Sequence, residues 1–234
     1  MDTNVNLDAL IAALALMAVC GLIFLAAVTL FFSIVQRKSA LAGAAVIAIV
    51  AIGAIYLGML LVFSFRSGDR LLARGEEKYF CEMDCHLAYS ITEVREKKIL
   101  EDNFNPGDSL NRLTAGGTFW LVTIRTRFDE NTVSPTRGDA PLHPNPRIVY
   151  VLDEQGTRYL PSPEGQLILG RSQDPGKAMS TPIRPGETYT TTVVFDLPVD
   201  VKNPTLLIQD DRPVTRLIIG HENSPFHKKI RFQL

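Results

Sequence analysis

This sequence has no excess of charge of either sign. Its 24 Lys and Arg residues are balanced by 25 Asp and Glu residues, which gives a formal net charge of −1. A protein that binds nucleic acid needs a basic face to neutralise phosphate groups. The composition therefore gives no support to nucleic-acid binding, and we expect no nucleic acid among the partners.

Motifs of the common enzyme classes are also missing. There is no Gly-x-Ser-x-Gly nucleophile elbow and no glycine-rich phosphate loop. His227 follows His221 by six positions with Pro225 between them, whereas a zinc protease needs His-Glu-x-x-His on a helix. The adjacent carboxylates Asp210 and Asp211 are interpreted as part of a solvated turn. We therefore expect a protein that is not an enzyme and holds no cofactor.

The first part of the chain has almost no charge. Between residues 9 and 65 only Arg37 and Lys38 are charged, and they separate two apolar runs, 9–35 and 40–65. Each run exceeds the roughly 20 helical residues that cross about 30 Å of hydrocarbon. A cleaved signal peptide would have a basic start and a shorter apolar core of about 7–15 residues. The sequence therefore predicts two transmembrane helices in an antiparallel hairpin.

Basic residues predict the orientation of this hairpin. The N-terminal tail, 1–8, has no Lys or Arg, whereas Arg37 and Lys38 lie in the link between the helices, so the positive-inside rule places the link in the cytoplasm. Four basic residues in the predicted linker, 66–79, favour the opposite orientation. The first helix usually dominates, and large domains cross membranes largely regardless of charge. We expect an inner-membrane protein with a periplasmic C-terminal domain.

Beyond residue 80 the sequence consists of short apolar runs between turn residues. In the segment 119–128, Trp120, Val122 and Ile124 lie on one face, which is typical of a strand with one buried face. Further strands are expected at 87–99, 147–153, 188–197, 205–209, 215–219 and 230–234. Short strands separated by turns predict an antiparallel β-sandwich over residues 80–234.

Two proline-containing segments, 131–147 and 162–182, are expected to be long loops. Loops of this length in a compact domain are uncommon and are often functional. If the domain binds a ligand, these loops are the first surfaces to test. The alternative is that both are passive covering loops.

Three longer segments carry a resemblance to a known family. They are GGTFWLVTIRTRFDEN (116–131), RIVYVLDEQGTRYLP (147–161) and IRPGETYTTTVVFDLPVDVKNPTLLI (183–208). They resemble the telokin-like, immunoglobulin-like domains of unknown function in bacterial surface and membrane-anchored proteins. The family's hairpin and Pro-Gly-Glu features fall on Asp153, Gly156, Tyr159, Pro185, Gly186, Glu187, Val193, Phe195, Asp196 and Pro198. The resemblance covers 87–234 and implies an immunoglobulin-like β-sandwich outside the cytoplasm, with no activity and no catalytic residues.

The segment 80–86 (Phe-Cys-Glu-Met-Asp-Cys-His) gathers side chains that bind metals. Thiolate, imidazole and thioether groups suit copper or zinc, so Cys81, Met83, Cys85 and His86 form a candidate metal site. A disulfide between the two cysteines is an alternative, and free thiols are a third. A straight strand would hold their Cα atoms about 13 Å apart, whereas a disulfide needs about 4.4–6.8 Å, so a disulfide requires a turn between them.

The architecture also loosely resembles subunit II of cytochrome c oxidase, in which two antiparallel helices precede an external β domain. The binuclear copper site of that family uses Cys-x-x-x-Cys, which is the spacing of Cys81 and Cys85. The sequence departs from the family because Tyr89 stands where a ligand histidine is expected. In the family the cysteines also fall late in the β domain, whereas Cys81 and Cys85 come first. Copper is therefore implied only as an alternative to a protein without a cofactor.

Together these patterns predict a membrane-anchored β-sandwich that acts as a non-enzymatic binding or accessory subunit of a membrane complex. Ala40, Ala44 and Ala48 recur every four positions, an interval that lets helix backbones approach closely in lipid. We therefore expect the lipid bilayer and another integral membrane protein as partners. The alternative function is a metal or thiol-redox protein that uses the segment 80–86.

Overall fold

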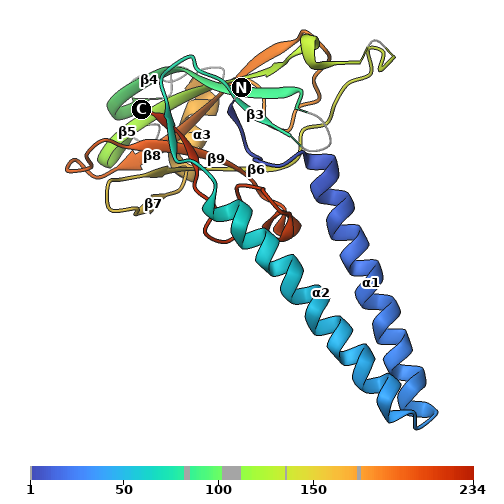
Figure 1. The fold of residues 1–234 in the computed structure, drawn as a ribbon. Helices are drawn as coiled ribbons and strands as arrows, with labels where there is room; N and C mark the ends of the chain where they lie inside the picture. Colours follow the sequence, from blue (N-terminus) through green and yellow to red (C-terminus); the bar gives the residue numbers. More distant parts are fainter. Residues whose placement is uncertain (1, 82–84, 102–111, 135, 173–174) are drawn as a thin grey trace.

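The computed structural model describes residues 2–81, 85–101, 112–134, 136–172 and 175–234. Within these ranges the chain forms a β domain of two five-stranded sheets, from which two long helices project as a hairpin (Figure 1). The mostly β class and the helical hairpin agree with the prediction from the sequence. The immunoglobulin-like topology stays a prediction.

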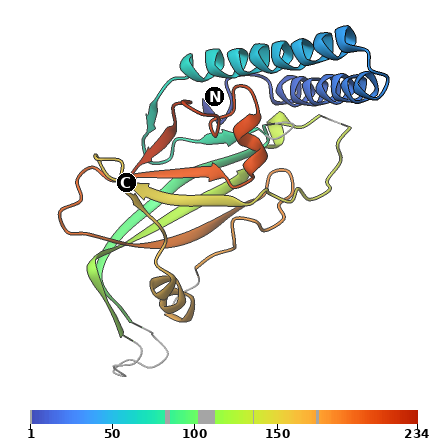
Figure 2. The ribbon, with the colours of Figure 1, turned by 90° about the horizontal axis from the view of Figure 1, so that it is seen from below.

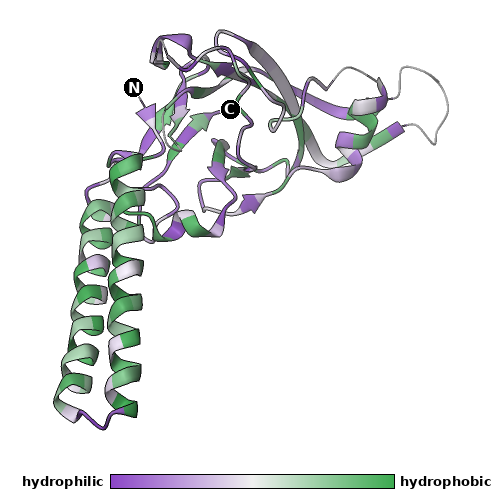
Figure 3. Ribbon diagram, turned by 90° about the vertical axis from the view of Figure 1, so that its right-hand side faces the viewer, coloured by the Kyte–Doolittle hydropathy of each residue, from purple (hydrophilic) through white to green (hydrophobic). Residues whose placement is uncertain are grey.

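The hairpin consists of α1 (Ala9–Val35) and α2 (Ser39–Phe65), which lie side by side and antiparallel (Figure 1). Asp8 caps α1, because its carboxylate accepts hydrogen bonds from the N–H groups of Leu10 and Ile11 at 3.0 and 3.1 Å. Most residues of both helices are hydrophobic (Figure 3). Few of their side chains are buried inside the structure. By length and composition, each helix can cross a membrane.

The two sheets have the strand orders β1-β3-β4-β5-β8 and β2-β10-β9-β6-β7. The first holds β1 (Asp2–Thr3), β3 (Lys78–Phe80), β4 (Leu87–Glu101), β5 (Arg112–Phe128) and β8 (Thr188–Leu197). The second holds β2 (Arg70–Leu72), β10 (Ile230–Gln233), β9 (Thr205–Asp210), β6 (Arg147–Leu152) and β7 (Arg158–Tyr159). The expected antiparallel pairing is incomplete, because β1 pairs with β3 and β2 with β10 in parallel.

The main core contains side chains from both sheets. Val122 and Ile124 of β5 and Phe195 of β8 are fully buried in one cluster with Leu206 and Ile208 of β9. The face of β5 that was predicted to be buried therefore belongs to this core.

The segment 162–182, predicted to be a loop, contains the helix α3 (Pro163–Ser172). Its residues Ile168 and Leu169 pack in a second buried cluster with Phe119 and Leu121 of β5. The prediction was wrong because Phe119 and Leu121 lie on the face of β5 that is opposite the main core. These apolar side chains need a cover of their own, and α3 provides it.

The strand predicted at 215–219 is also wrong, because η3 (Pro213–Leu217) is a 3-10 helix. Pro213 starts this helix and has no N–H group for a sheet ladder. The hydroxyl of Thr215 donates to the carbonyl of Arg212 at 2.6 Å, which keeps the chain turned. The other short 3-10 helix of the described ranges, η2 (Glu130–Thr132), follows β5.

Candidate functional site

Both ends of the hairpin are built into the β domain. Strand β1 comes directly before α1 and pairs with β3, so that Asp2 lies opposite Lys78 and Thr3 opposite Tyr79. After α2, the segment 66–79 holds β2 in one sheet and most of β3 in the other. Residues 1–8 were predicted to be a tail and residues 66–79 a linker, since neither segment has a clear apolar periodicity.

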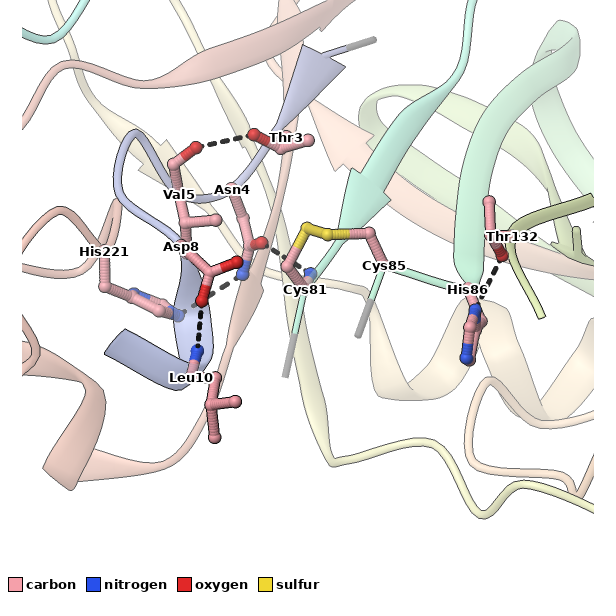
Figure 4. Close-up of a disulfide and its surroundings, with 10 residues drawn as sticks. All are labelled: Thr3, Asn4, Val5, Asp8, Leu10, Cys81, Cys85, His86, Thr132 and His221. Carbon is pink, nitrogen blue, oxygen red and sulfur yellow. Dashed lines mark hydrogen bonds between the residues drawn. A yellow bond between two sulfur atoms is a disulfide. The ribbon is translucent and has the colours of Figure 1, made fainter. Parts of the chain in front are cut away.

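Asn4 connects three parts of the domain. Its backbone N–H donates to the carbonyl of Tyr79 at 3.0 Å, and its backbone carbonyl accepts from the N–H of Glu222 at 2.8 Å. Its side-chain Oδ1 accepts from the N–H of Cys81 at 2.8 Å, and its Nδ2 lies 3.3 Å from Nε2 of His221 (Figure 4). The N-terminal segment therefore holds β3, the cysteine segment and the loop before β10 together.

A disulfide joins Cys81 and Cys85, whose Cα atoms are 4.0 Å apart (Figure 4). Sulfur atoms that are bonded to each other offer no thiolate to a metal, so a metal site here would require the reduced pair. Met83 lies outside the described residues. The copper or zinc alternative stays a prediction.

His86 does not face the disulfide. Its Nδ1 lies 2.6 Å from the hydroxyl of Thr132, and its ring stacks on Phe128 with centroids 5.3 Å apart (Figure 4). The side chain is buried. Among the described residues, no group of three or more His, Cys, Asp or Glu side chains is placed to hold a metal ion.

Lys78 of β3 forms a buried ion pair that no sequence pattern predicted. Nζ of Lys78 is 2.7 Å from Oε2 of Glu222, and it also donates to the carbonyls of Ile208 at 3.0 Å and Ile230 at 3.3 Å. Burial lowers the pKa of Lys78 and raises the pKa of Glu222. The ammonium group therefore connects the first sheet to two strands of the second.

A second buried pair joins Arg147, at the start of β6, to Asp210, at the end of β9, at 3.0 Å. Asp210 was interpreted as a solvated turn residue, but it is buried and also bonds Arg212 at 2.9 Å. Burial alone would raise the pKa of Asp210, but hydrogen bonds from Arg212 and the charge of Arg147 bring that pKa below its usual value. Phe80 lies near both buried cations, 4.4 Å from the guanidinium of Arg147 and 4.8 Å from Nζ of Lys78.

The loop that contains His221 follows η3, and His221 itself is buried. Its Nδ1 accepts a hydrogen bond from the N–H of Asn223 at 3.0 Å. Burial lowers the pKa of His221 to about 3, so the ring is neutral at pH 7.

Charged side chains on the outer face of the first sheet bind one another. Arg127 bonds Glu77 at 2.6 Å and Asp129 at 3.2 Å, and Arg125 bonds Glu77 at 3.2 Å. Hydrogen bonds from Arg127 hold the pKa of both carboxyls below their usual range. Burial and a hydrogen bond to Asp129 raise the pKa of Tyr79 to about 12. This cluster is arranged to hold strands together rather than to exchange protons.

The fold defines a class of protein, a two-sheet β domain that carries an apolar helical hairpin, and both ends of that hairpin join the domain. No family model matches the chain, and no curated protein matches it. The chain shows low similarity to MPT63, a secreted protein from Mycobacterium tuberculosis, with 11% identity over 71% of this chain and 98% of that chain and a TM-score of 0.42.

A conserved hypothetical protein from Bacillus anthracis shows 12% identity over 53% of this chain and 82% of that chain, with a TM-score of 0.37. Neither likeness is strong enough to carry a functional argument. The telokin-like resemblance stays a prediction.

Proposed function

We propose that this protein is a membrane-anchored β domain on the extracytoplasmic side, and that it acts as a non-enzymatic binding or accessory subunit of a membrane complex. The attachment of the hairpin carries the proposal. Strand β1 precedes α1 and β2 follows α2, and both lie in the domain's sheets. A hairpin held at both ends presents the domain to its surroundings in one orientation.

The surface of the hairpin supports lipid as its environment. Large apolar side chains such as Phe24, Ile47 and Ile55 are exposed along both helices. A soluble protein rarely exposes an apolar surface of this extent. Gly43 and Gly53 have open space where a Cβ atom would lie, which leaves room for a helix of a partner to approach.

Three features favour the extracytoplasmic side for the domain. The link with Arg37 and Lys38 lies at the far end of the hairpin from the domain (Figure 1). The positive-inside rule favours the cytoplasm for such a basic link, and therefore the opposite side of the membrane for the domain. Lys78, one of the basic residues that argued the other way, is buried in the domain. The disulfide in the structure is of a kind that persists in oxidising compartments.

A binding role is favoured over catalysis by the state of the polar side chains. The Lys78, Arg147 and Arg127 clusters are all bonded to carboxylates of the domain itself. Groups that neutralise one another in this way hold parts of the domain together, and these particular side chains are not free to act as a nucleophile or base.

Membrane fractionation tests the anchor. The full chain is expected to stay in the membrane pellet after high-salt and alkaline washes and to be released by a mild detergent. Recovery from the aqueous fraction without detergent would overturn the proposal. Alkaline phosphatase fused to the C-terminus should be active, and the same fusion in the link after Lys38 should be inactive.

Purification in mild detergent tests the accessory role. An integral membrane protein is expected to copurify in a fixed ratio and to be lost when Gly43 and Gly53 are both replaced by Phe. Replacing Ala12, which is buried near the start of α1, would instead disturb the packing of that helix. A chain that always purifies alone would contradict the accessory role but not the anchor.

A further inference from the structure

A cavity of about 390 Å³ lies on the outer face of the second sheet. It is lined by β6, β7, the end of β9, η3 and the loop before β10. In Figure 1, β6 and β7 lie on the lower side of the domain, from which the hairpin extends. Figure 2, seen from below, shows the chain between β9 and β10 beside the helices.

Positive charge dominates this cavity. Its lining includes four cations, Arg158, Arg212, Arg216 and Lys229, and two carboxylates, Asp210 and Asp211. Arg212 and the buried Arg147 already neutralise Asp210 at 2.9 and 3.0 Å. The three other cations, Arg158, Arg216 and Lys229, therefore outnumber the one other carboxylate, Asp211.

Two of these cations have guanidinium groups free for a ligand. Arg158 lies over the ring of Tyr150 at 4.9 Å, which orients it without using its N–H donors. Within the described ranges, neither Arg158 nor Arg216 forms an ion pair or a side-chain hydrogen bond. Lys229 lines the same cavity as Arg158, and its Nζ also donates to the backbone carbonyl of Glu222. Burial lowers the pKa of Lys229, and the charges of Lys78 and Arg158 act in the same direction against that of Glu222.

The floor of the cavity is held in place by its own hydrogen bonds. The hydroxyl of Tyr150 donates to Gln209 at 2.6 Å, and the Gln209 amide donates to Asn223 at 3.0 Å. Asn223 in turn donates to the carbonyl of Asp210 at 2.7 Å and to the hydroxyl of Thr215 at 2.8 Å. The floor is therefore preorganised.

The cavity lies next to the end of α2 that joins the domain. Arg216 precedes Leu217, whose carbonyl accepts a hydrogen bond from the hydroxyl of Tyr56 at 2.7 Å. Phe226 is 72% exposed and stacks on Phe65, the last residue of α2, with centroids 5.8 Å apart. The segment that carries Arg216 therefore runs beside the final turns of this helix.

The length of α2 indicates how far from the centre of a bilayer this segment lies. A helix of 27 residues is about 40 Å long, whereas the hydrocarbon core is about 30 Å thick. With the link at the opposite edge of the hydrocarbon core, the surplus of about 10 Å lets the domain end of α2 extend among the lipid headgroups. Tyr56 belongs to the half of α2 nearer the domain, and tyrosine is enriched at membrane interfaces.

We propose that this cavity binds a phosphate group, held by Arg158, Arg216 and Lys229. Guanidinium groups bind phosphate oxygens through paired hydrogen bonds, and a lysine adds a point charge. Because of its level beside α2, the source that the site favours is the phosphate of a phospholipid headgroup. This inference rests on the proposed function, since it names a ligand for the anchored domain.

The test measures binding by the full chain in neutral detergent. The probes are a short-chain phosphatidylglycerol and inorganic phosphate, and binding is followed by isothermal titration calorimetry. The variants are Arg158→Gln, Arg216→Gln and the double substitution. Arg171→Gln, an exposed arginine at the end of α3, is the control with the same loss of charge.

We expect phosphatidylglycerol to bind the wild type, and each cavity substitution to weaken binding by about tenfold. The control should bind like the wild type, and all variants should keep the same melting temperature and stay in the membrane fraction. Equal binding of inorganic phosphate would support the phosphate site and reassign its source to a soluble anion.

No binding of either probe to the wild type would overturn the inference, and so would an equal loss in the Arg171→Gln control. The proposed function has a separate test, because it depends on retention of the wild-type chain in washed membranes. A chain that binds phosphate through these arginines but leaves the membrane would keep this inference and remove the anchor.

Discussion

The ammonium group of Lys78 and the carboxylate of Glu222 lie 2.7 Å apart, with side chains that are 0% and 2% exposed. Lys78 belongs to β3 in the first sheet, and Glu222 belongs to the loop that bonds the N-terminal segment. A buried pair of this kind adds little stability relative to apolar residues, but the loss of one partner is costly. The pair therefore specifies how the two sheets and the hairpin's attachment fit together.

The substitution Lys78→Met should destabilise the protein strongly. Glu222 would remain buried without its cation, so the free energy of unfolding should fall by about 3–5 kcal/mol. Denaturant unfolding of the full chain in detergent, followed by tryptophan fluorescence, measures the change. Lys202→Met, at an exposed position, is the control and should change stability by less than about 0.5 kcal/mol.

The double variant Lys78→Met with Glu222→Met should recover part of this loss, because no buried charge remains. A single Lys78→Met variant as stable as the wild type would show that the pair does not organise the domain.

Stability should fall as the pH drops from 7 to 5, because of His221. Burial lowers the pKa of His221 to about 3 in the folded state, from 6.5 in the unfolded chain. The unfolded state therefore binds more protons between these values, and the stability contribution is present above pH 6.5 and lost as the pH falls toward 3. The loss at pH 5 amounts to about 2 kcal/mol.

His227, whose pKa is also lowered mainly by burial, acts with the same sign. Unfolding curves between pH 7 and 5 measure the slope, which should flatten in His221→Gln and flatten further when His227→Gln is added. An unchanged slope in both variants would refute this assignment.

Two glycines should respond to alanine in opposite directions. A Cβ atom on Gly117 of β5 would lie 1.8 Å from the carbonyl oxygen of Leu197, so Gly117→Ala should cost at least about 1–3 kcal/mol. Gly170 of α3 has no atom within 4 Å of that position, so Gly170→Ala should stabilise by about 0.5–1 kcal/mol. Thermal melting of both variants tests the pair, and a stable Gly117→Ala variant would contradict the register of β5 against β8.

The hairpin and the strands could be predicted because their signals are local. The uncharged runs at 9–35 and 40–65 need no tertiary information, and the alternation around Val122 and Ile124 directly reports a buried face. The helix α3 also had a local signal that was not used. Ser162 accepts a hydrogen bond from the N–H of Gly165 at 3.1 Å, and Ser-Pro-Glu is typical of a helix start.

The buried pairs could not be predicted, because their partners are far apart along the chain. Lys78 and Glu222 are separated by 144 positions, and Asn4 and Cys81 by 77. Nothing in the neighbouring residues distinguishes Asp210, which is buried, from Asp211, which is exposed. The choice between them depends on where Arg147 lies in the assembled second sheet.

The oxidation state of the cysteines separates the proposed function from its redox or metal alternative. A protein denatured without reductant and treated with an alkylating reagent should gain one label, at Cys20, and three labels after reduction. Cys81 and Cys85 are bonded in the structure, and Cys20 is free. Intact-protein mass spectrometry counts the labels, and Cys20→Ser should remove the label that needs no reduction.

The same purified chain should contain neither copper nor zinc in a fixed ratio by elemental analysis, because sulfur atoms in a disulfide cannot act as thiolate ligands. Three labels without reduction, together with bound metal that is lost in Cys81→Ser, would instead establish the metal site. Three labels without any metal would remove the disulfide's support for an oxidising compartment. The membrane anchor would survive that result, since it rests on the hairpin and on the strands that hold both of its ends.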